Sequence, residues 1–222
     1  DFDNDGIYNI FEPIRNSNTL SAGYQSSCAI ISDGSVNCWG INTNGQLGDG
    51  TTTNRSVATP VLGLDNGAVW VEVSEGNHAC AILDNGSVYC WGQNSAGQLG
   101  DGSFVERLTP VQVNGLGDER ATKLALGQYH SCALMERGEV RCWGGNSQGQ
   151  LGDGTTFGRP SASATSSLST NNDNAVSIVA GEQHTCALLQ DGGVSCWGWN
   201  YGGQLGIGSE ISQSSPQETT LT

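Results

Sequence analysis

The chain has 222 residues, of which 22 are acidic and 8 are lysine or arginine, giving a formal net charge of −14. A field of that sign repels nucleic acid and anionic membrane surfaces, and it attracts cations and basic partners. No stretch reaches the ~18 consecutive apolar residues of a membrane-spanning helix, so we expect neither a nucleic-acid partner nor a membrane span.

The first twelve residues fit a calcium-binding loop position by position. Acidic side chains stand at positions one, three and five, a glycine at six allows a sharp turn, and a glutamate at twelve can bind through both oxygens. The pattern resembles EF-hand-like, dockerin-like and thrombospondin type-3 loops, which implies a Ca²⁺ site in an extracellular protein. Its ligands would be Asp1, Asp3, Asp5, the carbonyl of Ile7, Asn9 and Glu12. The alternative is an acidic surface tail; in both interpretations residues 1–14 precede a domain in residues 15–222.

A three-part pattern recurs four times after this loop. Each copy has a cysteine, a Cys-Trp-Gly triplet whose cysteine stands ten residues later, and a Gly-Gln-Leu-Gly segment beyond the triplet. The tryptophans of the triplets, Trp39, Trp91, Trp143 and Trp197, are 52, 52 and 54 residues apart. Repetition at such a period predicts a tandem array of one structural unit, with repeats at about 19–68, 69–120, 121–174 and 175–222.

Within each repeat, the two cysteines flank a predicted β-hairpin. In the first repeat, a three-residue loop at 32–34 pairs Ile31 with Ser35 and sets Cys28 directly opposite Cys38. A two-residue loop would put the two cysteines on opposite faces of the hairpin, so the cysteines themselves favour the three-residue loop.

The facing cysteines predict one disulfide in each repeat. Metal binding is the alternative, but it needs spacings such as Cys-x-x-Cys, whereas nine residues separate the members of each pair. The expected pairs are Cys28 with Cys38, Cys80 with Cys90, Cys132 with Cys142, and Cys186 with Cys196. With the alternate apolar residues of its hairpin, each pair forms one face that we expect to be buried.

Two weaker strand candidates lie between successive hairpins. One follows a proline, at 60–62 and 110–113, and the other precedes the first cysteine, at 69–73, 123–126 and 177–179. Four short strands in about 50 residues are the unit of a propeller blade. The sequence therefore predicts an all-β fold of four β-propeller blades.

Residues 180–188 read Ala-Gly-Glu-Gln-His-Thr-Cys-Ala-Leu, and a glycine turn, a strand ending in Trp-Gly and a Gly-Gln-Leu-Gly segment follow. This order resembles the regulator of chromosome condensation repeat, over about residues 19–217. The resemblance implies a β-propeller, commonly seven-bladed, of which four repeats would be a part. With paired cysteines in every repeat, the chain resembles secreted bacterial members more closely, so we expect a secreted or cell-surface protein. The nuclear exchange-factor role of one subfamily is not implied.

Other recurrent side chains have structural roles in this interpretation. We expect the histidines to hydrogen-bond within their hairpins, the triplet tryptophans to pack between blades, and the aspartates after Gly-Gln-Leu-Gly to form turns. The histidines are His78, His130 and His184, and the aspartates are Asp49, Asp101 and Asp153. Trp199 and Tyr201 lie outside the repeat pattern and are candidates for partner contact, as are the variable loops at 104–107 and 157–159.

We therefore predict a non-catalytic binding or scaffold module, whose partner is a protein or glycan at the extracellular surface. Chemically equivalent repeats without a nucleophile–base pair favour this interpretation. One alternative is a structural subunit of an extracellular fibre or sheath, and another is a hydrolase or lyase with carboxylates and histidines converging in the propeller channel. An arc of four blades also leaves terminal faces uncovered, so we expect further repeats or copies to complete the ring, on the Trp197 side beyond residue 205.

Overall fold

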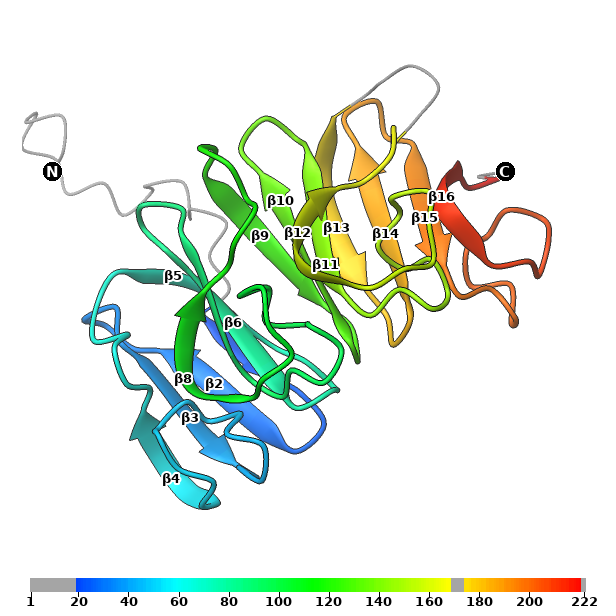
Figure 1. Cartoon of the computed structure of the whole chain (residues 1–222). Helices are drawn as coiled ribbons and strands as arrows, with labels where there is room; N and C mark the ends of the chain where they lie inside the picture. The colour runs from blue at the N-terminus through cyan, green and yellow to red at the C-terminus, as the bar shows by residue number, and fades with distance from the viewer. Residues whose placement is uncertain (1–18, 169–173, 221–222) are drawn as a thin grey trace, which may run out of the picture.

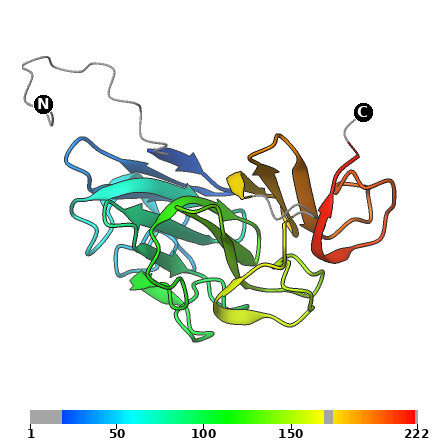
Figure 2. The same cartoon turned by 90° about the horizontal axis from the view of Figure 1, so that it is seen from above.

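A computed structural model of the chain describes residues 19–168 and 174–220. In this part, sixteen strands form four antiparallel sheets, and each sheet consists of four strands consecutive in the chain. Figure 1 shows the sheets as an arc of successive blades, and Figure 2 shows the same arc from above. The described residues contain no helix with the length and apolar character needed to cross a membrane. The predicted all-β architecture of propeller blades is confirmed.

The strands follow one another along each blade without crossovers. Their bounds are β1 (Leu20–Ala22), β2 (Ser26–Ile30), β3 (Val36–Gly40) and β4 (Arg55–Pro60) in the first blade; β5 (Ala68–Val73), β6 (His78–Leu83), β7 (Val88–Gly92) and β8 (Arg107–Gln112) in the second; β9 (Ala121–Leu126), β10 (His130–Met135), β11 (Val140–Gly144) and β12 (Arg159–Ala164) in the third; and β13 (Ala175–Ala180), β14 (His184–Leu189), β15 (Val194–Gly198) and β16 (Gln213–Glu218) in the fourth. Contacts join β1 to β5, β5 to β9, and β9 to β13, so the first strand of each blade lines the inner side of the arc.

The central hairpin of each blade has the predicted register. In the first blade, the amide of Ile31 donates to the carbonyl of Ser35 at 3.0 Å, and Cys28 lies directly opposite Cys38. Gly34 closes the turn with a φ of +81°, which lies in the left-handed region that glycine adopts readily. The Asp33 carboxylate accepts a hydrogen bond from the Ser35 amide at 2.9 Å, which fixes the turn from its side chain.

All eight cysteines are paired as this register requires. The disulfides join Cys28 to Cys38, Cys80 to Cys90, Cys132 to Cys142, and Cys186 to Cys196. Each bridge links the two middle strands of one blade, so every blade is closed covalently across its central hairpin.

The outermost strands begin earlier than the sequence predicts. Strand β4 ends at Pro60 rather than beginning there, and β8 includes Pro110 and ends at Gln112. Both are edge strands of their sheets, where a residue without an N–H group is tolerated because no further strand needs a donor. The prolines therefore lie within or at the end of these strands rather than marking their start.

The hydrophobic core consists of three clusters, each between two successive blades. In the cluster between the third and fourth blades, Cys132, Cys142 and Leu151 of the third blade are buried with Ile178 and Trp197 of the fourth. The other two clusters have the same composition, with the disulfide of one blade against the tryptophan of the next. The disulfides of the first three blades thus lie in the junctions with the blades that follow them.

The two terminal blades each have a face that no described blade covers. Leu188 in the fourth blade is 42% exposed, whereas its equivalents Leu134 and Ile82 are 3% and 1% exposed. The expectation that every cysteine-bearing hairpin face is buried is therefore wrong for the fourth blade. The expectation that the Trp197 side lacks a neighbour is also wrong, because Trp197 is fully buried against the third blade. Of the four triplet tryptophans, Trp39 in the first blade is the one that is partly exposed.

This difference between tryptophans predicts unequal effects of the same substitution. Trp143→Ala should lower the free energy of unfolding by about 3–5 kcal/mol, because it removes a large side chain from a closed core. Trp39→Ala should cost less than half of that, because Trp39 is partly solvated in the folded chain. Urea unfolding of the two variants beside the wild type measures both values, and equal losses would contradict the assignment of an open first blade.

Candidate functional site

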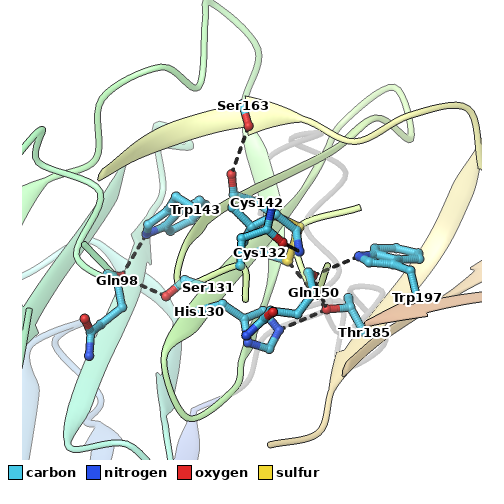
Figure 3. The surroundings of a disulfide bond; sticks show 12 residues. Gln98, His130, Ser131, Cys132, Cys142, Trp143, Gln150, Ser163, Thr185 and Trp197 are labelled. Carbon is cyan, nitrogen blue, oxygen red and sulfur yellow. Dashed lines mark hydrogen bonds between the residues drawn. A yellow bond between two sulfur atoms is a disulfide. The ribbon is translucent and has the colours of Figure 1, made fainter. Parts of the chain in front are cut away.

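The junction between blades is built on the backbone of the Gly-Gln-Leu-Gly segments. The carbonyl of Gln98 in the second blade accepts two hydrogen bonds from the third blade, from Trp143 Nε1 and Ser131 Oγ, each at 2.9 Å (Figure 3). Gly100 allows this approach, because a Cβ atom there would lie 2.8 Å from the same indole nitrogen and the residue has a φ of +72°. The tryptophans therefore join blades through a directed hydrogen bond as well as through packing, as expected for a buried indole N–H.

The same arrangement recurs at each junction. Trp91 donates to the carbonyl of Gln46 at 2.9 Å, and Trp197 donates to the carbonyl of Gln150 at 2.9 Å. All three indoles are fully buried, so the hydrogen bonds are shielded from water.

At two junctions, a histidine of one blade also forms a hydrogen bond with a hydroxyl group of the next blade. His130 Nε2 lies 2.9 Å from Thr185 Oγ1, and this hydroxyl donates to the carbonyl of Gln150 at 3.1 Å (Figure 3). Likewise, His78 Nε2 lies 2.9 Å from Ser131 Oγ. Since each hydroxyl donates its own proton to a carbonyl, its oxygen accepts from a protonated Nε2. The hydrogen bonds of His78 and His130 therefore run between blades rather than within their hairpins, and His78 Nδ1 also lies 2.8 Å from Ser74 Oγ in its own blade.

Burial keeps these histidines neutral. Loss of hydration lowers the pKa of His78 to about 3, and the neighbouring His130 adds to the shift. Loss of hydration lowers the pKa of His130 to about 3 as well, with a further contribution from His184. His184, on the uncovered face of the fourth blade, has a pKa lowered by its partial burial.

The histidines do not converge on the inner side of the arc. A cavity of about 180 Å³ opens there between the first strands, and its titratable lining residues are Glu75 and Glu182. His78 and His130 are instead fully buried in separate junctions. Within residues 19–168 and 174–220, no three His, Cys, Asp or Glu side chains are placed to hold a metal ion. The predicted calcium ligands, Asp1 to Glu12, lie outside the described residues and stay a prediction.

In each blade, a buried asparagine also holds the long loop that precedes the outer strand. Asn94, which is fully buried, donates from Nδ2 to the carbonyls of Ser103 and Val105 at 3.1 and 3.0 Å. Its Oδ1 accepts from the amide of Leu99 at 2.9 Å, so one side chain fixes both ends of the loop. The equivalent buried anchors of the other blades are Asn42, Asn146 and Asn200.

An ion pair reinforces the loop in three blades. Arg107 contacts the carboxylate of Asp101 at 2.7 Å, and Asp101 is 8% exposed. Although partial burial opposes ionisation, hydrogen bonds from Ser103 and Arg107 hold the pKa of Asp101 below its ordinary value. The other pairs are Asp49 with Arg55 and Asp153 with Arg159. The aspartates are thus more than turn formers, and in the fourth blade Ile207 and Gln213 stand where the pair would be.

The anchored loops present apolar side chains to solvent. We call Phe104, Val105, Phe157, Tyr201 and Ile211 together the loop face; their exposed fractions are 59%, 59%, 75%, 77% and 70%. They lie in the connections that follow the third strand of successive blades, and therefore at the same end of the array. Tyr201 is exposed as the sequence suggests, whereas Trp199 is partly buried. The sequence singled out the loops at 104–107 and 157–159 but missed Ile211 and the buried asparagines, although the asparagines recur at a fixed distance from the aspartates.

The model of the regulator of chromosome condensation (RCC1) repeat matches the chain at residues 33–83, 85–134, 137–188 and 191–221. The chain belongs to this family. A second model of the same repeat matches residues 19–46, 121–150 and 175–204. The matches cover most of the described blades and confirm the resemblance that the motifs indicate.

Curated RCC1-repeat relatives include a receptor and a group of ligases. The chain is 33% identical over 211 residues to the ultraviolet-B receptor UVR8 of Arabidopsis thaliana, covering 95% of this chain and 48% of that protein. It is 35% identical over 214 residues to the probable E3 ubiquitin-protein ligase HERC6 of Homo sapiens, covering 93% of this chain and 21% of that protein. The chain therefore spans half or less of the length of these relatives.

Solved structures share the blade architecture. Human WBSCR16 superposes with a TM-score of 0.80 at 23% identity, over 92% of this chain and 53% of that chain. Prp20p of Saccharomyces cerevisiae, described with its binding properties to Gsp1p and histones, superposes with a TM-score of 0.78 at 22% identity, over 91% and 50%. At this sequence identity, the similarity shows the fold alone. Because the chain covers about half of each solved structure, it corresponds to part of a propeller.

The buried histidines predict a specific dependence of stability on pH. Unfolded histidines bind a proton below a pH of about 6.5, whereas folded His78 and His130 resist protonation down to a pH of about 3. Their contribution is therefore fully present above pH 6.5 and falls as the pH drops, by roughly 1.4 kcal/mol per pH unit for each residue. The aspartates Asp49, Asp101 and Asp153, with lowered pKa values, act in the same direction only below a pH of about 4.

Urea unfolding between pH 5 and pH 7 should therefore show a shallower slope in His130→Gln than in the wild type. The Gln side chain can still donate a hydrogen bond to Thr185 but does not titrate. An unchanged slope, or an imidazole NMR signal of His130 that titrates near pH 6.5 in the folded wild type, would contradict the buried junction.

Proposed function

We propose that this chain is a secreted or cell-surface binding and scaffold module without a catalytic centre, and that it binds its partner through the loop face. The proposal rests on the difference between the fixed backbone of each loop and its variable exposed tip. The backbone is held by a buried asparagine, and in three blades by an ion pair, while the exposed tip differs from blade to blade.

A fixed backbone with variable tips is suited to recognition. Because the loops are already ordered, binding costs little conformational entropy. The equivalent tips are Thr53, Val105, Phe157 and Ile211, whose backbone carbonyls accept from the anchoring asparagines in all four blades. Different side chains on the same frame allow one face to match one partner specifically.

The chemistry of the loop face favours a polypeptide partner over a glycan. Three of its five exposed side chains, Phe104, Phe157 and Tyr201, are aromatic, and aromatic residues are enriched in protein interfaces. The net charge of −14 favours a partner with basic residues around an apolar centre, since long-range attraction would speed its approach. Three arginines of the loops pair with Asp49, Asp101 and Asp153, so these pairs are neutral and the remaining carboxylates give the field its sign.

A non-catalytic role is supported by the positions of the titratable groups. The enzymatic alternative requires histidines and carboxylates that converge in the channel. His78 and His130 are instead buried and hydrogen-bonded in two separate junctions. A relative named as a receptor, the ultraviolet-B receptor UVR8, is consistent with a binding role, and the match covers 48% of that protein. What that protein binds is not transferred to this chain.

Secretion is supported by the disulfides. A bridge in every blade persists in oxidising surroundings and is rare in the cytosol. Each closes a short loop, which contributes about 2–3 kcal/mol in the chain-entropy model. Such covalent closure stabilises a module that works outside the cell.

Photo-crosslinking tests the loop face. A benzoylphenylalanine placed at Phe157 or Tyr201 should yield a discrete adduct when the protein is illuminated with cell-surface extract of the source organism. The matched control is the same residue at Ile31, which is 49% exposed in the hairpin turn at the other end of a blade. Adducts of equal yield from Ile31, or none from either loop position, would count against the proposal.

We also propose that the N-terminal loop binds Ca²⁺, as its sequence pattern indicates. Calorimetric titration of the chain with calcium chloride should give one site, and Asp5→Asn combined with Glu12→Gln should abolish it because both residues supply anionic oxygens. Asp118→Asn, an exposed carboxylate in the second blade's exit loop, should leave the titration unchanged. Absence of heat in the wild type would refute the site.

A further inference from the structure

The cavity on the inner side of the arc is lined by the ends of all four first strands. The last residues of β1, β5, β9 and β13 are Ala22, Val73, Leu126 and Ala180, and each of them lines this space of about 180 Å³. Every blade thus contributes an apolar side chain from the same position. Walls of this kind accept an aliphatic chain.

Two glycines form a further part of the wall with their backbone. Gly127 follows Leu126, Gly181 follows Ala180, and both line the cavity. A Cβ atom at Gly127 would overlap the imidazole ring of His130, and one at Gly181 would overlap the ring of His184. The histidines therefore exclude side chains at these two positions, and the cavity between the strand ends is part of the built fold.

The charged residues that line the cavity are both acidic. Glu75 of the second blade and Glu182 of the fourth are exposed, and neither carboxylate forms an ion pair with a described residue. No lysine or arginine is among the lining residues. Lys123 lies near the start of β9 and donates to the carbonyl of Val176 at 3.0 Å, near the start of β13. The charge at the cavity is therefore uncompensated, and it attracts a cation.

The cavity lies at the same end of the array as the loop face. Successive strands are antiparallel, so the turn after the first strand and the loop after the third strand of a blade lie at one end. Hydrogen bonds join the two directly: the amide of Gly145, in the loop after β11, donates to the carbonyl of Tyr129, in the turn after β9, at 2.7 Å. A partner on the loop face can therefore reach the cavity with a flanking residue.

We propose that this cavity receives the side chain of a lysine from the polypeptide partner, an inference that rests on the proposed binding through the loop face. The methylene groups of the lysine pack against Val73, Leu126 and Ala180, and its ammonium group is held by the carboxylates of Glu75 and Glu182. A lysine suits both features, because it joins an unbranched apolar stem to a compact cation.

A small probe tests the cavity without the partner. N-acetyl-lysine N-methylamide, added to the full chain at low ionic strength, should move the backbone amide NMR signals of Gly127 and Gly181 along saturable curves. The norleucine counterpart, which keeps the stem but lacks the ammonium group, should shift these signals far less. Absence of a saturable shift with the lysine probe, or an equal response to the norleucine probe, would overturn the proposal.

Two variants separate the cavity from general attraction to an acidic surface. Glu75→Gln combined with Glu182→Gln should weaken probe binding about fivefold or more, since exposed ion pairs contribute up to about that factor each. Ala180→Leu should abolish the response while preserving the charge, and the fold should tolerate it because Leu126 occupies the equivalent position in the third blade. The control Glu136→Gln, an exposed carboxylate in the β10–β11 turn, should change nothing. Unaltered binding in either cavity variant would refute the site.

The partner itself provides the last arm of the test. The adduct formed by benzoylphenylalanine at position 157 should fall in yield when Glu75→Gln and Glu182→Gln are added. An undiminished adduct would retain the loop face and contradict the lysine in the cavity. Probe binding measured in the absence of a partner does not depend on that adduct, so failure of the cavity and failure of the loop face are separate results.

Discussion

The structure depends on a single backbone carbonyl at each junction between blades. The glutamine of a Gly-Gln-Leu-Gly segment accepts a hydrogen bond from the buried tryptophan of the next blade, and in two junctions a second one from a hydroxyl group. In water-excluded surroundings such bonds are directional and costly to lose. They fix the position of each blade on the previous one, whereas the apolar clusters supply the bulk of the favourable burial.

This division of roles explains how one repeat can be stable while its loops differ from blade to blade. At each of the three junctions, the disulfide of one blade packs against the tryptophan of the next, so these residues recur along the array. The long loops leave the junctions and are held by their own asparagines, so their tips are free to differ without disturbing the blades. The repeat thus separates the residues that hold the blades together from the loop residues that vary between blades.

The sequence predicted the hairpins correctly because their constraints are local. Two cysteines ten residues apart around a glycine turn admit only one register that brings them together. The sequence-based prediction misassigned the open side of the fourth blade. The alternation of side chains along a strand defines two faces, but it does not indicate which face packs against the next blade. The partners of His78 and His130 could not be predicted either, since they lie 53 and 55 residues away in another repeat. The outer strands were misplaced because an edge strand tolerates proline.

Exchange of indole protons measured by NMR tests the central role of the junction carbonyl most directly. The Nε1 protons of Trp91, Trp143 and Trp197 should exchange with solvent several orders of magnitude more slowly than that of Trp70, whose indole donates to Glu72 in a partly buried position. Exchange at Trp143 as fast as at Trp70 would contradict a closed junction and the account built on it.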